Sequence, residues 1–129
     1  MTYCEAMRLG AMKRPQAFGK LIDYSTGGTC ARGAVLDACG YTLDGKEMDD
    51  RIIFEIALGI LESADKGSPF GAKIVQMNDM FRMSRTAIAD RIESQGLDRE
   101  IPEELLRHKD KHEQSKELHH NDTRQLVSV

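Results

Sequence analysis

The segment over residues 51–64, RIIFEIALGILESA, most constrains the fold, because its apolar residues fall on almost every face of a helix. Asp49 and Asp50 precede it, where the positive end of a helix dipole favours negative charge. A helix of this kind is poorly suited to a surface. We therefore expect residues 51–64 to form the central core helix, on which the neighbouring elements pack. Ser68-Pro69 is then a cap and a first-turn proline that start another helix.

Two further helices are indicated before this segment. Thr2 and Glu5 have the spacing of a capping box, and Pro15 prevents the helix that they start from continuing far. Thr29 can cap a second helix over residues 30–39, whose small residues allow a neighbouring helix to come close. These patterns predict an inner helix that is packed tightly against another element.

The connection between those two helices has a different character. Residues 18–24 alternate between apolar and polar side chains, and Ser25-Thr26-Gly27-Gly28 is a turn by composition. The whole chain therefore predicts one mainly α domain of four to five helices over residues 1–98, with a possible small hairpin near the N-terminus. Residues 99–129 are expected to form a polar, charged tail that is a solvated helix or disordered.

Composition limits the classes of function. The chain has 129 residues, a charged fraction of 30% and a net charge of −3, so no overall basic excess indicates nucleic acid, although a local basic patch is still allowed. Its three cysteines form no CxxC pair and follow no secretory leader, which favours reduced thiols and a cytoplasmic location. The apolar run over residues 52–61 is too short to span a membrane.

The stretch over residues 77–96 carries the most specific pattern. Ser84 is a good N-cap, Gly96 can end the helix in a left-handed conformation, and Ile88 and Ile92 lie one turn apart. A short helix of this kind is what a helix-turn-helix protein places in the major groove of DNA. DNA binding through the helix from Ser84 to Gly96 is therefore one hypothesis.

Several residues in the same stretch argue against DNA binding. Arg82 occupies the position where the turn usually needs glycine, Asn78 the position of a usual alanine, and Arg91 a position that is normally apolar. Asp90 would also repel phosphate. The favoured interpretation is a packed helix beside an exposed loop that binds a protein partner. The expected partner-binding residues are two apolar anchors and three charged contacts: Met80, Phe81, Arg82, Arg85 and Arg91.

Asn78, Asp79 and Cys30 are candidates for a ligand site, as a second alternative. The side chains of Asn78 and Asp79 can bind a ligand, but they can also close a loop by bonding to backbone amides. Cys30 at a helix N-terminus could have a lowered pKa, as a reactive nucleophile does. The first histidine in the sequence is His108, so no histidine before it can serve as a base, and no phosphate-binding loop is present.

All four histidines lie in the polar tail, at positions 108, 112, 119 and 120. His108 and His112 would share one face of a helix, and two imidazoles with a third ligand can bind zinc or nickel. Metal sites need a second shell of supporting residues that this tail does not offer. We therefore expect adventitious binding here, with no specific metal site, no cofactor and no catalytic residues.

The order of three features resembles that of uncharacterised bacterial and phage domains. These features are Cys30-Ala31-x-Gly33-Ala34 opening a helix, an apolar helix, and Asn78-Asp79 before a helix led by serine or threonine. The resemblance covers about residues 6–96 and implies that the Cys30 helix and the Asn78-Asp79 loop belong to one compact unit. It also implies a prokaryotic or mobile-element source, and it assigns no activity or binding residues.

The function predicted from these observations is non-catalytic. No set of acid, base and nucleophile can be assembled from the folded part of the chain. We expect a small cytoplasmic interaction protein, such as a phage-type regulator or inhibitor, that binds a macromolecular partner, most simply another protein. Nucleic acid remains the alternative partner, and a small-molecule or enzyme site near Cys30 is the second alternative.

Overall fold

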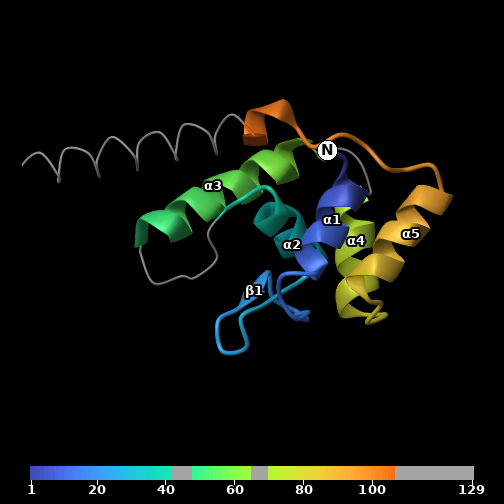
Figure 1. Ribbon diagram of the computed structural model, residues 1–129, viewed down its shortest axis with the longest axis horizontal. Coiled ribbons are helices and arrows are strands. Elements are labelled where there is room, and N and C mark those ends of the chain that lie inside the picture. The colour runs from blue at the N-terminus through green and yellow to red at the C-terminus, as the bar shows by residue number, and fades with distance from the viewer. Residues whose placement is uncertain (42–47, 65–69, 107–129) are drawn as a thin grey trace, which may run out of the picture.

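The computed structural model describes residues 1–41, 48–64 and 70–106; at residues 48–51 and 54 it describes the backbone alone. This part of the chain is mainly helical with one small antiparallel hairpin, as the sequence predicts, and ends in a short helical turn at residues 103–106 (Figure 1). The elements are, in order, α1 (Tyr3–Ala11), β1 (Ile22–Asp23), β2 (Gly28–Thr29), α2 (Ala31–Ala38), α3 (Met48–Ala64), α4 (Phe70–Asp79) and α5 (Arg85–Ser94).

Helices α1 and α2 form the centre of the fold. α1 begins at the predicted capping box, in which the Thr2 hydroxyl accepts from the Glu5 N–H and the Glu5 carboxylate accepts from the Thr2 N–H. Gly10 lies directly against α2: a Cβ at this position would be 1.9 Å from the carbonyl oxygen of Ala34. The two backbones therefore touch, and only glycine fits at the contact.

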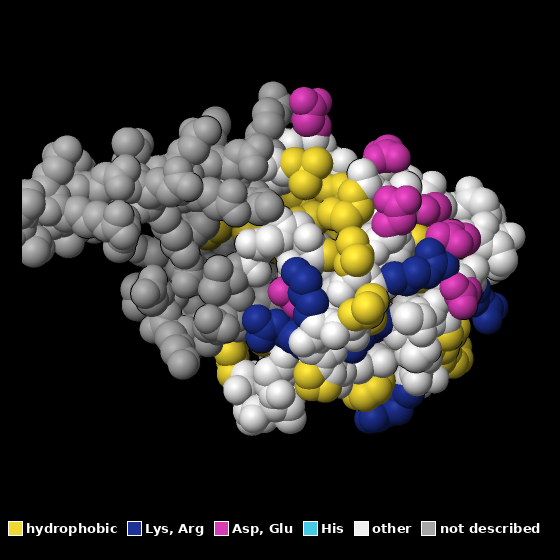
Figure 2. Space-filling model, in the orientation of Figure 1, with side chains coloured by type: hydrophobic (Ala, Val, Ile, Leu, Met, Phe, Trp, Pro, Cys, Tyr) yellow, Lys and Arg dark blue, Asp and Glu magenta, His cyan; other side chains and the backbone are white. Residues whose placement is uncertain are grey.

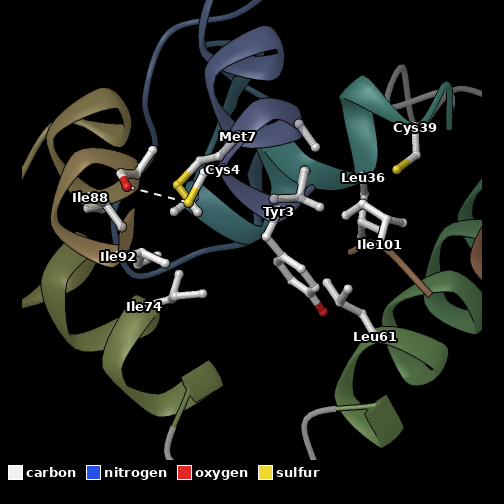
Figure 3. Packing of buried hydrophobic residues seen from close by; sticks show 14 of the residues in the cluster. Tyr3, Cys4, Met7, Leu36, Cys39, Leu61, Ile74, Ile88, Ile92 and Ile101 are labelled. Atoms are coloured by element: carbon white, nitrogen blue, oxygen red, sulfur yellow. Dashed lines mark hydrogen bonds between the residues drawn. The ribbon is translucent and has the colours of Figure 1, made fainter. Parts of the chain in front are cut away.

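The core lies around these two helices, and α5 packs on the other side of α1 (Figure 3). Met7 faces Ile88 and Ile92 of α5, and all three are buried. Tyr3 makes an edge-on contact with Phe70 of α4, with ring centroids 5.2 Å apart. Each fully buried side chain of this size contributes roughly 1.5–3 kcal/mol to the hydrophobic stabilisation.

The prediction that residues 51–64 form the central helix is wrong. α3 lies to one side of α1 and α2 (Figure 1), and it contributes Ala57 and Leu61 as its fully buried residues among the side chains described. Ile52 and Ile56 are 49% and 47% exposed, and nothing lies within 4 Å of a Cβ built at Gly59. The apolar sequence of α3 led to the prediction of a central helix. Small residues at the α1–α2 contact instead let those two helices pack closely at the centre of the fold.

The hairpin and the start of α2 are joined. β1 pairs antiparallel with β2 through Ile22–Thr29 and Asp23–Gly28, so the predicted hairpin is confirmed and Thr29 belongs to its second strand. Cys30, and not the predicted Thr29, is the N-cap of α2, and its sulfur accepts from the Gly33 N–H at 3.5 Å. The strand therefore passes directly into the helix.

The packed domain continues beyond residue 98, where the sequence predicted the start of the tail. Ile101 and Leu105 are buried in the core, and the Tyr41 hydroxyl donates to the Leu105 carbonyl at 2.6 Å. The Tyr3 N–H donates to the Arg99 carbonyl at 2.9 Å, which ties this segment to the start of α1. The rest of the predicted tail, residues 107–129, and Ser68-Pro69 lie outside the described residues. Among the helices described, none is long and apolar enough to cross a membrane.

Candidate partner-binding surface

Helices α4 and α5 are joined by a tight turn over residues 80–84. The N–H groups of Met80 and Phe81 both donate to the Gln76 carbonyl, at 3.0 and 3.2 Å. Arg82 takes a φ of 50°, which is uncommon for a residue other than glycine. Ser84 then caps α5, as predicted, by accepting from the Ala87 N–H at 3.1 Å. The turn is thus held by backbone bonds at the α4 end and by the Ser84 side chain at the α5 end.

This turn presents apolar side chains to solvent. Met80 and Phe81 are 72% and 64% exposed, so both predicted anchors are accessible. The Arg82 guanidinium is also exposed and lies 4.6 Å above the Phe18 ring, a cation–π contact that holds the turn against residues near the hairpin. Large apolar side chains on an ordered turn can bind a partner without the entropic cost of ordering a loop.

A hollow of about 560 Å³ lies beside the turn, between α4 and α5. Phe81 and two methionines supply its apolar lining, and the charged residues among those described there are Lys73 and Arg91, both positive. We call this surface the α4–α5 hollow. Its lining residues are Lys73, Gln76, Met77, Phe81, Met83, Arg91 and Gln95.

Arg85, expected to contact a partner, is instead buried at 6% exposure. One nitrogen of its guanidinium donates to the Thr29 hydroxyl at 2.9 Å, and the other donates to the Arg14 carbonyl at 2.6 Å. Longer bonds reach the carbonyls of Thr29 and Ala11, both at 3.3 Å. Burial lowers the pKa of Arg85. Its charge therefore joins α5 to the segments around α1 and β2 and is not available to a partner.

Asn78 is also an internal connector. Its side-chain oxygen accepts from the Gln16 amide at 2.8 Å and from the Ala31 N–H at 3.1 Å. Its amide nitrogen donates to the Ala17 carbonyl at 3.0 Å and to the Asp79 carboxylate at 2.7 Å. With these four bonds the buried side chain is fully used. The structural interpretation of Asn78 is therefore favoured over a ligand contact.

Cys30 and Asp79 lie close to Asn78, as the ligand-site hypothesis required, and line a cavity with it. Asp79 accepts from the Gly19 N–H at 2.9 Å. Burial raises the pKa of the Cys30 thiol, which is the opposite of the lowered value expected for a reactive nucleophile. Cys30 is thus a neutral thiol at neutral pH. All three cysteines are buried as free thiols.

The opposite side of α5 is acidic and already paired. Figure 2 shows Asp and Glu side chains gathered at the right of the molecule, around a basic one. Arg8 of α1 bonds to Asp90 at 2.6 Å and to both oxygens of Glu93, and this contact lowers the pKa of Glu93. Near this contact, the side-chain atoms of Cys4, Glu93 and Asp98 that could bind a metal ion lie within 4.8 Å of one another.

Existing bonds occupy that Cys4 cluster. The Asp98 carboxylate accepts from the N–H groups of Cys4 at 3.1 Å and Arg99 at 2.9 Å, while the Cys4 thiol donates to the Ala89 carbonyl at 3.4 Å (Figure 3). Burial, together with the Asp98 carboxylate, raises the pKa of Cys4 to about 12. The cluster therefore holds α1, α5 and residues 98–99 together through a neutral thiol.

Sequence reasoning found part of the surface. Met80, Phe81, Arg82 and Arg91 are all exposed around the turn and the hollow, whereas Arg85 is not. Sequence reasoning missed the residues of α4 that line the hollow. The spacing of Lys73, Met77 and Phe81, each four residues after the last, could have indicated a shared face. The four histidines, including the His108–His112 pair, lie outside the described residues. The chain matches no protein-family model, no curated protein and no solved structure in the three comparisons made.

Proposed function

We propose that the protein is a non-catalytic binding module that takes an acidic, amphipathic segment of a partner protein into the α4–α5 hollow. One observation carries this proposal: exposed Phe81 lines the α4–α5 hollow, in which the charged residues among those described, Lys73 and Arg91, are both positive. An aromatic anchor within a polar rim is the usual composition of an energetic hot spot. Carboxylates of the partner would pair with the two basic residues.

The chemistry of the hollow favours binding over catalysis. Its described lining consists of amide, thioether, aromatic and cationic side chains, with no carboxylate, thiol or imidazole among them. General acid–base and nucleophilic catalysis require such groups within hydrogen-bond reach of a substrate. Among the described lining residues, the Lys73 amine is the one group that could transfer a proton or attack a substrate, and no carboxylate, thiol or imidazole accompanies it, so recognition fits this lining better than catalysis.

The test identifies the partner at the surface itself. A photo-crosslinking amino acid at position 80 should capture one protein from nuclease-treated native lysate, and mass spectrometry identifies it. With that protein purified, Phe81→Ser should weaken binding by about thirtyfold, which corresponds to ~2 kcal/mol. Arg91→Glu should weaken it by about tenfold or more through charge repulsion.

Met12→Ser is the control, because Met12 is an exposed apolar residue, at 84% against 64% for Phe81, that does not line the hollow. This variant should bind the captured partner like the unaltered protein. Equal affinities for the Phe81→Ser, Arg91→Glu and Met12→Ser proteins would remove the α4–α5 hollow as the binding surface.

DNA binding through α5 is the second candidate, favoured by the short turn between α4 and α5 and by the positive φ of Arg82 within it. Against it, Asp90 and Glu93 are exposed on α5 and Arg85 of its first turn is buried. This candidate predicts duplex binding, measured by fluorescence polarisation, that falls steeply between about 50 and 200 mM salt. Affinity that does not change over this range would eliminate it.

A further inference from the structure

A separate cavity lies on the other side of α4, where the ends of α2 and α4 come together with the loop before β1. It opens to solvent, and its volume is about 230 Å³. That is about eight times the ~30 Å³ that one water molecule occupies in the liquid, enough space for a molecule of roughly the size of leucine. Cys30, Asn78 and Asp79 line it, and none of the residues lining the α4–α5 hollow does.

Two helix ends of opposite polarity meet at this cavity. α2 begins there, and Arg32 in its first turn has a side chain that is only 15% exposed. α4 ends there, at Asp79. A helix N-terminus favours negative charge and a C-terminus favours positive charge. The cavity therefore lies beside backbone partial charges of both signs, at two helix termini that are joined by the bond from the Ala31 N–H to the Asn78 side chain.

Charged side chains of both signs line the cavity. Lys20 and Arg32 line the cavity as cations, and Asp79 and Glu62 line it as anions. The Arg32 guanidinium approaches the Glu62 carboxylate at 3.8 Å, which is longer than a hydrogen bond, so its donors can still bond to a bound molecule. The first N–H groups of α2 are less available, because those of Ala31 and Gly33 already have acceptors. A carboxylate would thus be bound by side chains more than by backbone.

The remaining wall is apolar. Leu21 and Leu58 are half-buried, Ile74 is buried, and Val75 is partly exposed at the edge. A branched aliphatic side chain would bury its surface against these residues, at about 25 cal/mol per Å² removed from water.

We propose that this cavity binds a small zwitterion with an aliphatic side chain, that is, a free aliphatic amino acid. Its carboxylate pairs with Arg32 and Lys20, its ammonium group with Asp79 and Glu62, and its side chain packs against Leu58, Ile74 and Val75. The neutral Cys30 thiol contributes a non-charged wall. This site is independent of the α4–α5 hollow and gives the module a second, small ligand.

Isothermal titration calorimetry of the 129-residue chain with leucine is the direct test. Leucine should bind, and two analogues should bind at least about tenfold more weakly, because each leaves charged groups of the cavity without a partner. These analogues are 4-methylpentanoate, which lacks the ammonium group, and isopentylamine, which lacks the carboxylate. Lack of leucine binding, or analogues that bind as well as leucine, would overturn the proposal.

Variants locate the site. Arg32→Met should reduce leucine affinity about tenfold or more, and Val75→Trp should block the cavity from its exposed edge in case the first variant is unstable. Thermal denaturation of each variant shows whether it is folded. If both are folded and still bind leucine with unchanged affinity, the cavity is not the site.

The Phe81→Ser protein separates this proposal from the proposed function. Leucine should bind to it unchanged, because Phe81 lies outside the cavity. Leucine binding can therefore fail while partner binding through the α4–α5 hollow holds, and the reverse can also occur. Loss of leucine binding in the Phe81→Ser protein, with its fold intact, would contradict the assigned location.

Discussion

The two faces of the α4–turn–α5 segment use the same kinds of side chain for different purposes. On the inward face, Asn78 and Arg85 bond to backbone and side chains of distant segments and are buried. On the outward face, Phe81 and Arg91 are exposed beside a hollow. A polar or charged residue near a turn is thus no sign of a binding site, and an apolar one there is no sign of a core.

The difference between the faces is energetic. A buried polar group whose partner is removed costs about 1–3 kcal/mol, more when it is charged, whereas exposed substitutions usually change stability by less than about 0.5 kcal/mol. Inward substitutions should therefore lower the free energy of unfolding, and outward ones should alter binding alone. The following four changes test this separation, in order of decreasing effect on stability.

Asn78→Leu should have the largest effect. It removes four hydrogen bonds and leaves the Ala31 N–H and the Ala17 carbonyl buried without these partners. We expect the free energy of unfolding to fall by about 3–5 kcal/mol in urea denaturation. Gln76→Leu is the control, since Gln76 is exposed on the same helix. Similar losses for the two variants would contradict the distinction between the faces.

Arg85→Met should destabilise the protein by about 2–3 kcal/mol. The apolar stem is replaced, but the carbonyls of Ala11, Thr29 and Arg14 lose the donors of the guanidinium. Arg91→Met removes the same group from the outward face, and urea denaturation of that variant should match the unaltered protein. An unchanged midpoint for Arg85→Met would show that the buried charge is dispensable.

Raising the pH should destabilise the inward contact between α1 and α5. The pKa of Cys4 is raised to about 12 in the folded chain, from the ordinary thiol value of 9.0. The stabilisation that comes from the protonated thiol is fully present below about pH 9 and is lost as the pH rises toward 12. The loss amounts to about 1 kcal/mol at pH 10. Thermal denaturation between pH 8 and 11 measures this slope.

Cys4→Ala should reduce that slope. Part of it should remain, since the pKa of Cys30 is also raised by burial and has the same sign. A Cys4→Ala protein with the full alkaline slope would show that the thiol between α1 and α5 does not titrate as described.

Phe81→Ser should have the smallest effect on stability, within about 0.5 kcal/mol, because most of this side chain is exposed. The same variant carries the large expected loss of partner affinity, so it separates the two faces most sharply. Its urea midpoint and its affinity for the crosslinked partner should be measured on one preparation. A large loss of stability would show that Phe81 belongs to the core.

Local signals predicted local structure well. The Thr2 and Glu5 capping box and the Ser84 cap each form as expected, because a cap depends on residues within one turn of helix. The hairpin and the mainly α architecture also follow from the sequence. Exposure of Met80 and Phe81 agrees with the polar residues that surround them.

Predictions that depend on distant partners failed. Arg85 looked available because charged residues are rarely buried, but its acceptors lie more than fifty positions earlier in the chain. The apolar helix α3 looked central, yet the contact between Gly10 and Ala34 decided which helices meet. Periodicity describes one element at a time, so it cannot rank elements that compete for the centre.

The tie between the first residues and residues 99–101 affects how the protein is made. The Ile101 N–H donates to the Met1 carbonyl at 2.9 Å, so the two stretches meet only after nearly all of the described chain exists. At about 5–20 residues per second on the ribosome, α1 waits roughly 5–20 s for this partner. During that time the backbone bonds to residues 99–101 cannot form, whereas α2, which packs directly against α1, is already complete, so α1 can pack on α2 before this last segment arrives.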